Sequence, residues 1–209
     1  MNEITNTMNP HATASRVQSG PCLPSGVFRP SFAFYHANAR GTGSALKLEL
    51  HPAHDDTEGS IMATFAPQAT IGGGRGNERT FSTFNWEGAV CVKLGFEDLC
   101  KILQVFRGET ETINEGKGLY HRSPTGSVKI QLVHCLEEVT GYSFSVSKTL
   151  SDASERDIRI FFAPWEALGL CESIANSLGV ICFGIPMVIP HDTSAYRAKV
   201  KEVRNGVAA

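Results

Sequence analysis

The sequence has little net charge, which limits how the protein could attract a polyanion. Its 209 residues carry a formal net charge of −2. The whole molecule therefore supplies no positive field for nucleic acid or for an anionic membrane. Binding to nucleic acid would depend on a local patch of cations or on stacking against aromatic side chains.

The sequence also lacks paired cysteines and long apolar runs. None of its 6 cysteines forms a CxxC pair, and most lie within apolar patterns, as free buried cysteines do. This indicates a reducing compartment and no disulfide framework. No apolar run reaches the roughly 18 residues that a membrane span needs. Residues 170–189 come nearest, but Glu172, Asn176 and Pro186 interrupt them, so we expect no membrane association.

Both ends of the chain are poor in large apolar side chains. Residues 1–30 are rich in Asn, Thr, Ser, Pro and Gly, and such a segment cannot bury enough surface to fold, so a disordered tail is predicted. It has no signal-peptide core and little transit-peptide character. We therefore expect a cytoplasmic, nucleoid-associated protein, with organelle import as the alternative. Residues 191–209 predict a second tail with a short basic helix.

What the sequence does contain is one unit written twice. The stretch 43–51 (GSALKLELH) is echoed by 126–134 (GSVKIQLVH). Later in each copy an apolar strand leads through a short turn into a helix, at 89–94 into 96–99 and at 158–162 into 165–168. This pattern predicts two similar sheets in pseudo-symmetry, a shape suited to a long, flexible ligand.

Hydrophobic periodicity places the elements of this α+β domain, which we expect to span 31–190. The expected strands are 31–36, 44–51, 60–66 and 81–94 in the first copy, and 118–122, 126–136, 141–149 and 157–162 in the second. A flexible loop is expected at 68–80, and helices are expected at 96–107 and 164–178. Both helices are apolar over a broad arc, which needs burial on two sides. We therefore predict an oligomer with a helical centre.

Several short motifs follow one another along the chain in an order and spacing that can be compared with a known family. Phe84-Asn85-Trp86, followed without a gap by residues 87–103, resembles the Tyr-Asp-Trp strand-to-helix segment of the Whirly family of single-stranded-DNA-binding proteins. Phe65-Ala66-Pro67 resembles the Phe-Ala-Pro of that family. Residues 141–146 and the segment from 158–160 to Glu166 resemble its later strands and last helix. The resemblance covers roughly 31–184 and extends to the related trypanosome mitochondrial guide-RNA-binding proteins.

The resemblance implies a duplicated ββββα unit. It consists of two packed antiparallel four-stranded sheets, with helices that form the core of a tetramer. It also implies binding of single-stranded DNA, or secondarily RNA, along the sheet edges with little sequence preference, in replication, repair, recombination or transcription. One motif departs from the family: where it has Lys-Gly-Lys-Ala-Ala-Leu, this chain has residues 41–46, GTGSAL. Both lysines are missing, although Arg40 and Lys47 flank the stretch and could compensate in part.

Sequence-neutral binding of a single strand requires aromatic faces for bases and cations near phosphates. The aromatic candidates lie in the predicted strands. The candidate cations lie on the polar faces of these strands, opposite the apolar side chains, or, for Arg40, at the predicted turn before residue 44. The expected site residues are Tyr35, Arg40, Lys47, Phe84, Trp86, Lys93, Lys129, Tyr142 and Arg159. Arg75 and Arg79, beside a glycine-rich loop, could close over a bound strand.

Signals for other functions are weak. The stretch 72–76 (GGGRG) is not a P-loop, because no Gly-Lys-Ser/Thr follows. His51, His54, Asp55 and Asp56 do not have the spacing of a tight metal site. No catalytic set stands out, so we expect no enzyme and no cofactor. The alternative is a structural or regulatory oligomer of the same fold that acts through protein partners, which the missing lysines favour.

Overall fold

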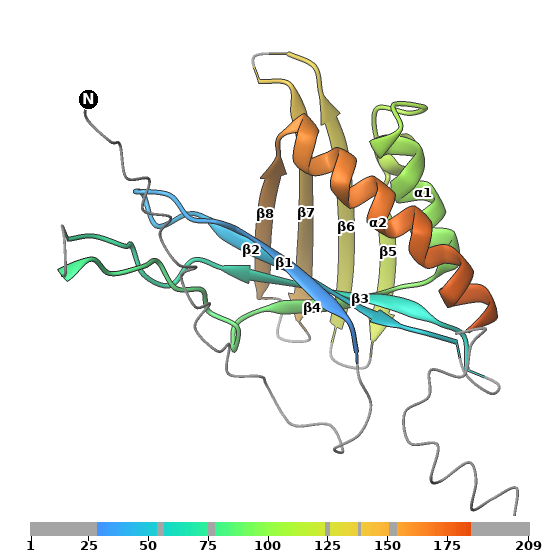
Figure 1. Ribbon diagram of the computed structural model, residues 1–209, viewed down its shortest axis with the longest axis horizontal. Coiled ribbons are helices and arrows are strands. Elements are labelled where there is room, and N and C mark those ends of the chain that lie inside the picture. The colour runs from blue at the N-terminus through green and yellow to red at the C-terminus, as the bar shows by residue number, and fades with distance from the viewer. Residues whose placement is uncertain are drawn as a thin grey trace, which may run out of the picture.

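The computed structural model describes residues 29–53, 57–74, 78–123, 126–137, 139–150 and 154–184. They form two antiparallel four-stranded sheets with strand orders β1-β2-β3-β4 and β5-β6-β7-β8, and two α-helices. Sheet 1 comprises β1 (Ser31–His36), β2 (Ser44–His51), β3 (Ser60–Pro67) and β4 (Val90–Leu94). Sheet 2 comprises β5 (Leu119–Ser123), β6 (Gly126–Cys135), β7 (Gly141–Leu150) and β8 (Glu155–Phe162). The strands of sheet 1 cross those of sheet 2 at a steep angle (Figure 1).

The predicted duplication is confirmed, because each half is a meander of four strands followed by a helix. α1 (Phe96–Phe106) follows β4, and α2 (Pro164–Phe183) follows β8. The echoed stretches 43–51 and 126–134 correspond to β2 and β6, the second strand of each sheet. Equal sequence patterns therefore occupy equal places in the two sheets.

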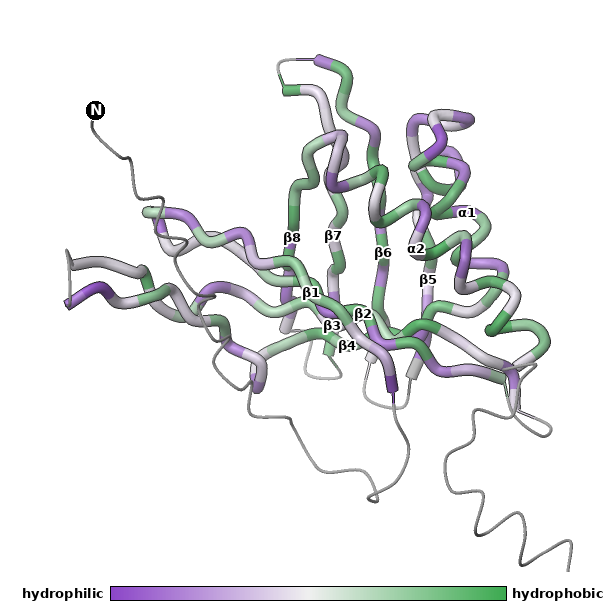
Figure 2. The backbone as a smooth tube through the Cα atoms, viewed as in Figure 1, coloured by the Kyte–Doolittle hydropathy of each residue, from purple (hydrophilic) through white to green (hydrophobic). Residues whose placement is uncertain are grey.

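Alternation along each strand separates an inner from an outer face. In β2, Leu46 and Leu48 are buried whereas Lys47 and Glu49 are partly exposed. In the tube representation, hydrophobic and hydrophilic segments alternate along the strands (Figure 2). Because successive side chains point to opposite faces, the register aligns Lys47 with Ala33, Thr64 and Cys91 on the outer face of sheet 1.

The inner faces of the two sheets pack against each other through aromatic rings. The rings of Phe65 and Phe144 lie 5.1 Å apart, and those of Phe34 and Phe162 lie 5.0 Å apart, both edge to face. Phe65, Phe144 and Phe162 are fully buried. These contacts hold sheet 1 in place, so its outer face is a fixed surface.

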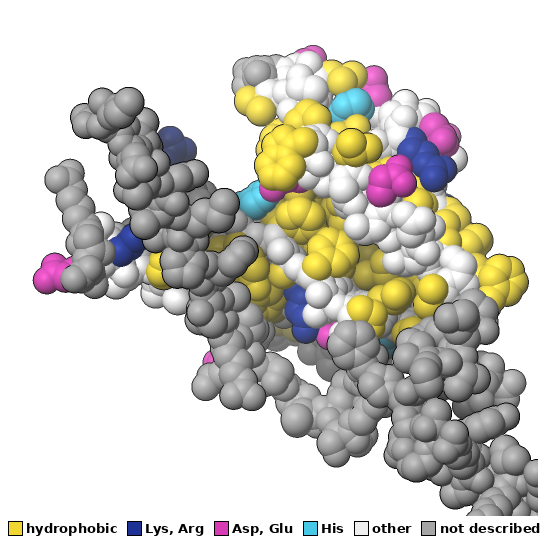
Figure 3. Space-filling view, viewed as in Figure 1, with side chains coloured by type: hydrophobic (Ala, Val, Ile, Leu, Met, Phe, Trp, Pro, Cys, Tyr) yellow, Lys and Arg dark blue, Asp and Glu magenta, His cyan; other side chains and the backbone are white. Residues whose placement is uncertain are grey.

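α1 packs against α2, and each helix also contacts sheet 2. One face of α2 enters the core through Ala167, Leu170 and Ile174, whereas Trp165 and Leu168 are 74% and 65% exposed. Apolar side chains gather along α2 in the space-filling view (Figure 3). α2 is also long and apolar enough to cross a membrane by length and composition, although the sequence led us to expect no such run. Its buried face is nevertheless part of the protein core.

Each half of the fold fastens the helix of the other half. His36 at the end of β1 donates from Nε2 to Glu166 Oε1 of α2 at 2.8 Å, and Glu166 also accepts the backbone N–H of Ala163. In the other direction, His121 Nε2 of β5 lies 3.3 Å from Asp98 Oδ2 of α1. In both cases the carboxylate is the third residue of its helix and accepts the N–H of the residue before the helix.

Most predicted element boundaries are confirmed to within a few residues, with two differences. The expected strand 81–94 is a strand only over Val90–Leu94, and α2 continues to Phe183 rather than ending at 178. Residues 68–84 are not simply a loop: within their described part, isolated bridges pair Gln68 with Phe84 and Gly73 with Thr80. This paired segment, here called the arm, extends sideways from sheet 1 (Figure 1). The predicted tails at 1–30 and 191–209 lie outside the described residues except for Arg29 and Pro30.

Candidate nucleic-acid interface

The outer face of sheet 1 combines aromatic rings at one end with cations along its strands. Five of the predicted site residues lie on or beside it. They are Tyr35, Lys47, Phe84, Trp86 and Lys93. The sequence placed these residues on three expected strands, 31–36, 44–51 and 81–94. The sheet register aligns the first two with β4, and the ring contacts of Tyr35 bring Phe84 and Trp86 to the same face.

The aromatic end is a cluster of three rings. Tyr35 of β1 lies 5.5 Å from Phe84 and 6.4 Å from Trp86, measured between ring centroids. Tyr35 is 50% exposed, and the other two rings are partly buried. Tyr35 pairs with Ala45 in β2, whose side chain is completely buried. The cluster therefore offers aromatic surface held by its neighbours, which suits a stacked base.

The chain around Trp86 forms a tight turn that holds the ring at the surface. Asn85 Oδ1 accepts the N–H of Gly88 at 2.8 Å, and Asn85 N–H donates to Pro67 O at 2.8 Å. Asn favours turns because its side chain bonds to the backbone a few residues on. At Gly88 a Cβ would lie 2.7 Å from Asn85 Nδ2, so a larger residue there would displace the Asn85 side chain that holds this turn.

Arg40 lies in the turn between β1 and β2, at the same end of the sheet as Tyr35. The buried Gln68 holds this turn: its Oε1 accepts the N–H groups of Asn38 and Gly43, and its Nε2 donates to the carbonyls of Asn38 and Thr70. The exposed Arg40 is therefore carried on an ordered turn beside the aromatic cluster.

The cations of the outer face outnumber its acids. Glu49 is the only carboxylate in β1–β4, against Lys47 and Lys93. Lys47 lies two residues further along β2 than Ala45, and therefore about 7 Å from the row that contains Tyr35. Lys93 shares a row with Met62 and Glu49. An extended ligand that ran across this face from the aromatic cluster would meet first the amine of Lys47 and then that of Lys93.

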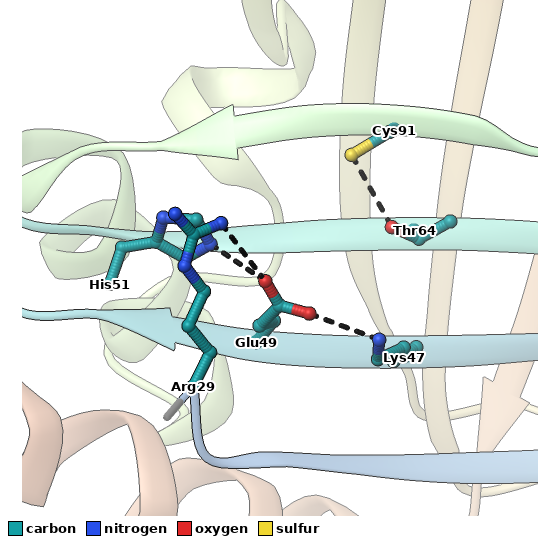
Figure 4. A network of polar contacts seen from close by, with 6 residues as sticks. All are labelled: Arg29, Lys47, Glu49, His51, Thr64 and Cys91. Carbon is teal, nitrogen blue, oxygen red and sulfur yellow. Dashed lines mark hydrogen bonds and ion pairs between the residues drawn. The ribbon is translucent and has the colours of Figure 1, made fainter. Parts of the chain in front are cut away.

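Glu49 is surrounded by donors (Figure 4). Its Oε2 accepts from Lys47 Nζ at 3.0 Å, and its Oε1 accepts from His51 Nε2 at 2.9 Å and lies 3.6 Å from Arg29 Nη1. Burial alone would raise the pKa of Glu49, but the hydrogen bonds from Lys47 and His51 outweigh it, so its pKa lies below the ordinary value. The carboxylate therefore stays ionised.

The arm carries an exposed aromatic ring of its own. Phe81 is 73% exposed, and the Arg79 guanidinium lies 5.3 Å from its ring centroid. Thr70 and Thr83 bond across the arm at 2.8 Å. Arg79 thus lies against Phe81 rather than folding over the sheet, while Arg75 lies outside the described residues.

Two other predicted cations, Lys129 and Arg159, lie on the outer face of sheet 2. Their rows contain serines of β7, and Lys129 shares its row with Asp157 of β8. The exposed ring in this region is Tyr120, which lies 5.9 Å from the Arg122 guanidinium. This face is therefore polar and of mixed charge. Its β8 edge adjoins the aromatic cluster, because Arg156 Nη1 of β8 donates to Gly88 O at 3.1 Å in the turn that carries Trp86.

Tyr142 is a core residue, so its prediction as a stacking platform needs correction. It is 9% exposed, its hydroxyl donates to Phe106 O at 3.2 Å, and its ring stacks on His134 at 4.4 Å. Even-numbered positions of β7 point inward, and a base could not reach this ring without opening the core.

Sequence reasoning missed Arg29, Glu49 and His51. The alternation in 44–51 placed Lys47 and Glu49 on one face, and His51 two residues further on continues the same row. Arg29 precedes β1, and only the pairing of β1 with β2 brings it to Glu49. The charged group around Glu49 could be found in part from the sequence, because Lys47, Glu49 and His51 follow one another at every second residue.

Among the described residues, no group of three or more His, Cys, Asp or Glu side chains could hold a metal ion. One hollow of about 200 Å³ lies between β1–β3 and α2 and is lined by apolar residues such as Phe32, Leu48 and Ile174. Its lining offers hydroxyls of serine but no ionisable group.

Comparison with known proteins gives a match in structure. No family model matches the sequence, and no curated protein does. The crystal structure of WHY1 from Arabidopsis thaliana has a TM-score of 0.60 at 13% identity, over 89% of this chain and 96% of that one. WHY3 from the same plant has 0.59 at 15%, over 86% and 99%. The plant transcriptional regulator PBF-2 has 0.55 at 14%, over 86% and 90%. This chain therefore has the fold of the Whirly proteins.

Proposed function

We propose that the protein binds single-stranded nucleic acid, single-stranded DNA first and RNA second, with little sequence preference. The observation that carries this proposal is the cluster of Tyr35, Phe84 and Trp86 beside the cations of the outer face of sheet 1. The similarity in fold to the plant transcriptional regulator PBF-2 supports it. A role in replication, repair, recombination or transcription would follow from such binding.

Stacking and phosphate contacts divide the work between the two ends of this surface. An aromatic ring that stacks on a base contributes about 1–3 kcal/mol whatever the base, because every base has a π-face. Lys47, Lys93 and Arg40 would contact phosphates, which carry no sequence information. Neither kind of contact reads base edges, so the site favours single strands over duplex and discriminates little between sequences.

We also propose that the protein is a tetramer assembled through α2. Trp165, Leu168 and Phe183 are 74%, 65% and 87% exposed on this helix, and Phe96 of α1 is 51% exposed. Large apolar side chains gathered on one surface are characteristic of an interface. Assembly through the helices would leave the outer faces of the sheets free, so that several copies could engage one strand.

A second candidate function is a structural or regulatory oligomer that binds protein partners only. The apolar surface of α2 and the net charge of −2 favour it. This candidate predicts that the aromatic cluster has no role in binding a ligand, which separates it from the main proposal.

The test is fluorescence anisotropy of a labelled oligo-dT of about 30 nucleotides, a length that offers several sites of the size single-strand-binding domains use. A duplex competitor and a salt series accompany the full chain. The diagnostic variant is Trp86→Ala, and Tyr120→Ala, on the outer face of sheet 2, is the matched control. We expect Trp86→Ala to weaken binding about 5- to 150-fold, the equivalent of one lost stacking contact, and Tyr120→Ala to leave it unchanged.

Other results would lead to different conclusions. Absence of binding at low salt by a folded oligomer would exclude the proposal and favour the protein-partner candidate. An equal loss in both variants would place binding across both sheets. Competition by duplex as strong as by single strand would exclude stacking as the main contribution.

A further inference from the structure

The network around Glu49 has more cations than its one carboxylate neutralises. Lys47, Arg29 and His51 all approach Glu49, within 3.0, 3.6 and 2.9 Å. Lys47 and Arg29 each carry a full positive charge, so the cluster keeps an excess of one positive charge even when His51 is neutral. Lys93 in the same row as Glu49 adds another. An anion is therefore attracted to this place despite the carboxylate.

The carboxylate occupies the position that a phosphate oxygen would take. Lys47, Glu49 and His51 follow one another on the outer face at every second residue of β2, and their side chains are 38%, 23% and 25% exposed. The donor nitrogens of Lys47, His51 and Arg29 converge on the two carboxylate oxygens of Glu49 (Figure 4). A phosphate presents oxygens that accept the same donors, and Arg and Lys bind it readily.

We propose that Arg29, Lys47 and His51 form a phosphate subsite of the outer face of sheet 1, in which Glu49 is an internal competitor that holds the three donors until the phosphate displaces it. This inference rests on the proposed function, because the phosphate belongs to the backbone of the bound single strand. Glu49 lowers affinity and keeps the donors pointed at one place. It is a positioning residue that does not itself contact the ligand.

The proposal accounts for the position of the subsite. It lies along β2 from the aromatic cluster, so a strand stacked on Trp86 and Tyr35 would run over Lys47 towards Glu49. A negative charge about 4 Å from a phosphate in water weakens binding about fivefold, and more where the surroundings are less polar. Glu49 therefore sets how easily the protein releases the strand.

The experiment measures oligo-dT binding by the full chain with Glu49→Gln, Lys47→Met and the double variant. We expect Glu49→Gln to bind about fivefold more tightly, and its plot of log affinity against log salt to steepen by about 0.7 for each phosphate gained. Lys47→Met should remove most of the gain when combined with Glu49→Gln, since the freed amine is what binds the phosphate. Glu97→Gln removes a carboxylate that pairs with Lys101 on α1 and should not alter binding.

The outcomes separate this inference from the proposed function. If the wild-type protein binds and Glu49→Gln binds equally or more weakly, the competitor role is wrong and the proposed function stands. If no form binds, the proposed function itself fails. A gain in Glu49→Gln that persists in the double variant would reflect general charge and also overturn the subsite.

A measurement on the wild type covers the case in which Glu49→Gln does not fold. Acylation of lysines is followed by mass spectrometry with and without oligo-dT. Lys47 should be protected when the strand is bound, and Lys101 should react equally in both samples. Unchanged reactivity of Lys47 under saturating oligonucleotide would overturn the subsite.

Discussion

The bond between His36 and Glu166 should be worth a measurable part of the stability, because it joins the first strand of one half to the helix of the other. The perturbations are His36→Phe, which retains an aromatic ring against Phe162, and Glu166→Ala. The bond is 2.8 Å long, and the side chains are 30% and 12% exposed. A hydrogen bond to a charged group contributes about 1.5–3 kcal/mol, and partial exposure favours the lower value.

We therefore expect a coupling free energy of about 1.5 kcal/mol from the double-mutant cycle. Thermal and urea unfolding of the wild type, the two single variants and the double variant measure it. For a domain of this size, each kcal/mol of lost stability lowers the melting temperature by about 2–4 °C. Loss of this one bond should therefore lower the melting temperature by about 3–6 °C.

The exposed pair of Glu97 and Lys101 is the control, because such pairs contribute little, and its cycle should show no measurable coupling. A coupling below about 0.5 kcal/mol for His36 and Glu166 would lie within ordinary additivity and would refute the idea that the halves fasten each other's helices. The same cycle on His121 and Asp98, 3.3 Å apart, should give a smaller value, because the contact is longer.

Four other predictions concern separate parts of the fold. Phe65→Ala should lower the free energy of unfolding by about 3–5 kcal/mol in urea titrations, because the ring is fully buried between the sheets; a loss below 1 kcal/mol would contradict that packing. Leu168→Glu should reduce the mass found by analytical ultracentrifugation, because it places a charge on the exposed apolar surface of α2; an unchanged mass at low concentration would exclude that interface. Gln68→Ala should cost about 1–3 kcal/mol through its unsatisfied partners and should speed amide exchange at Gly43, which would stay slow if the turn held itself. The lowered pKa of Glu49 stabilises the folded protein at pH values above the ordinary carboxyl pKa, and this contribution disappears as pH falls through the folded-state pKa. In Glu49→Gln the free energy of unfolding should therefore fall less steeply on the acid side when it is measured against pH. An unaltered pH dependence would argue against this contribution.

Regular alternation and the repeated motif made most of the fold predictable from the sequence. Leu46, Leu48 and Leu50 alternate with polar residues, and this period fixes both the strand and its inner face. The equivalence of 43–51 with 126–134 then predicts the second sheet. The region 81–89 could not be predicted in the same way, because its composition is strand-like. Instead, residues 81–84 form one side of the arm, and the chain turns after Asn85.

The candidate site could be predicted only as a set of residue types. The sequence determined that Tyr35, Trp86, Lys47 and Lys93 lie in or beside strands, since local patterns specify strands and their faces. It did not determine which of them meet, because pairing between strands depends on the register of distant segments.

Tyr142 and Glu49 illustrate this division between local pattern and tertiary structure. As an aromatic residue in a strand, Tyr142 has the same local signature as Tyr35, yet α1 covers it and the ring is buried. Glu49 looks like an ordinary solvent-facing acid until β1 brings Arg29 beside it. The sequence by itself determined the duplicated strands and helices, because their hydrophobic periods are local. Only the tertiary structure decided which rings stay exposed and which cations gather around one carboxylate, because burial and charge contacts depend on what packs alongside.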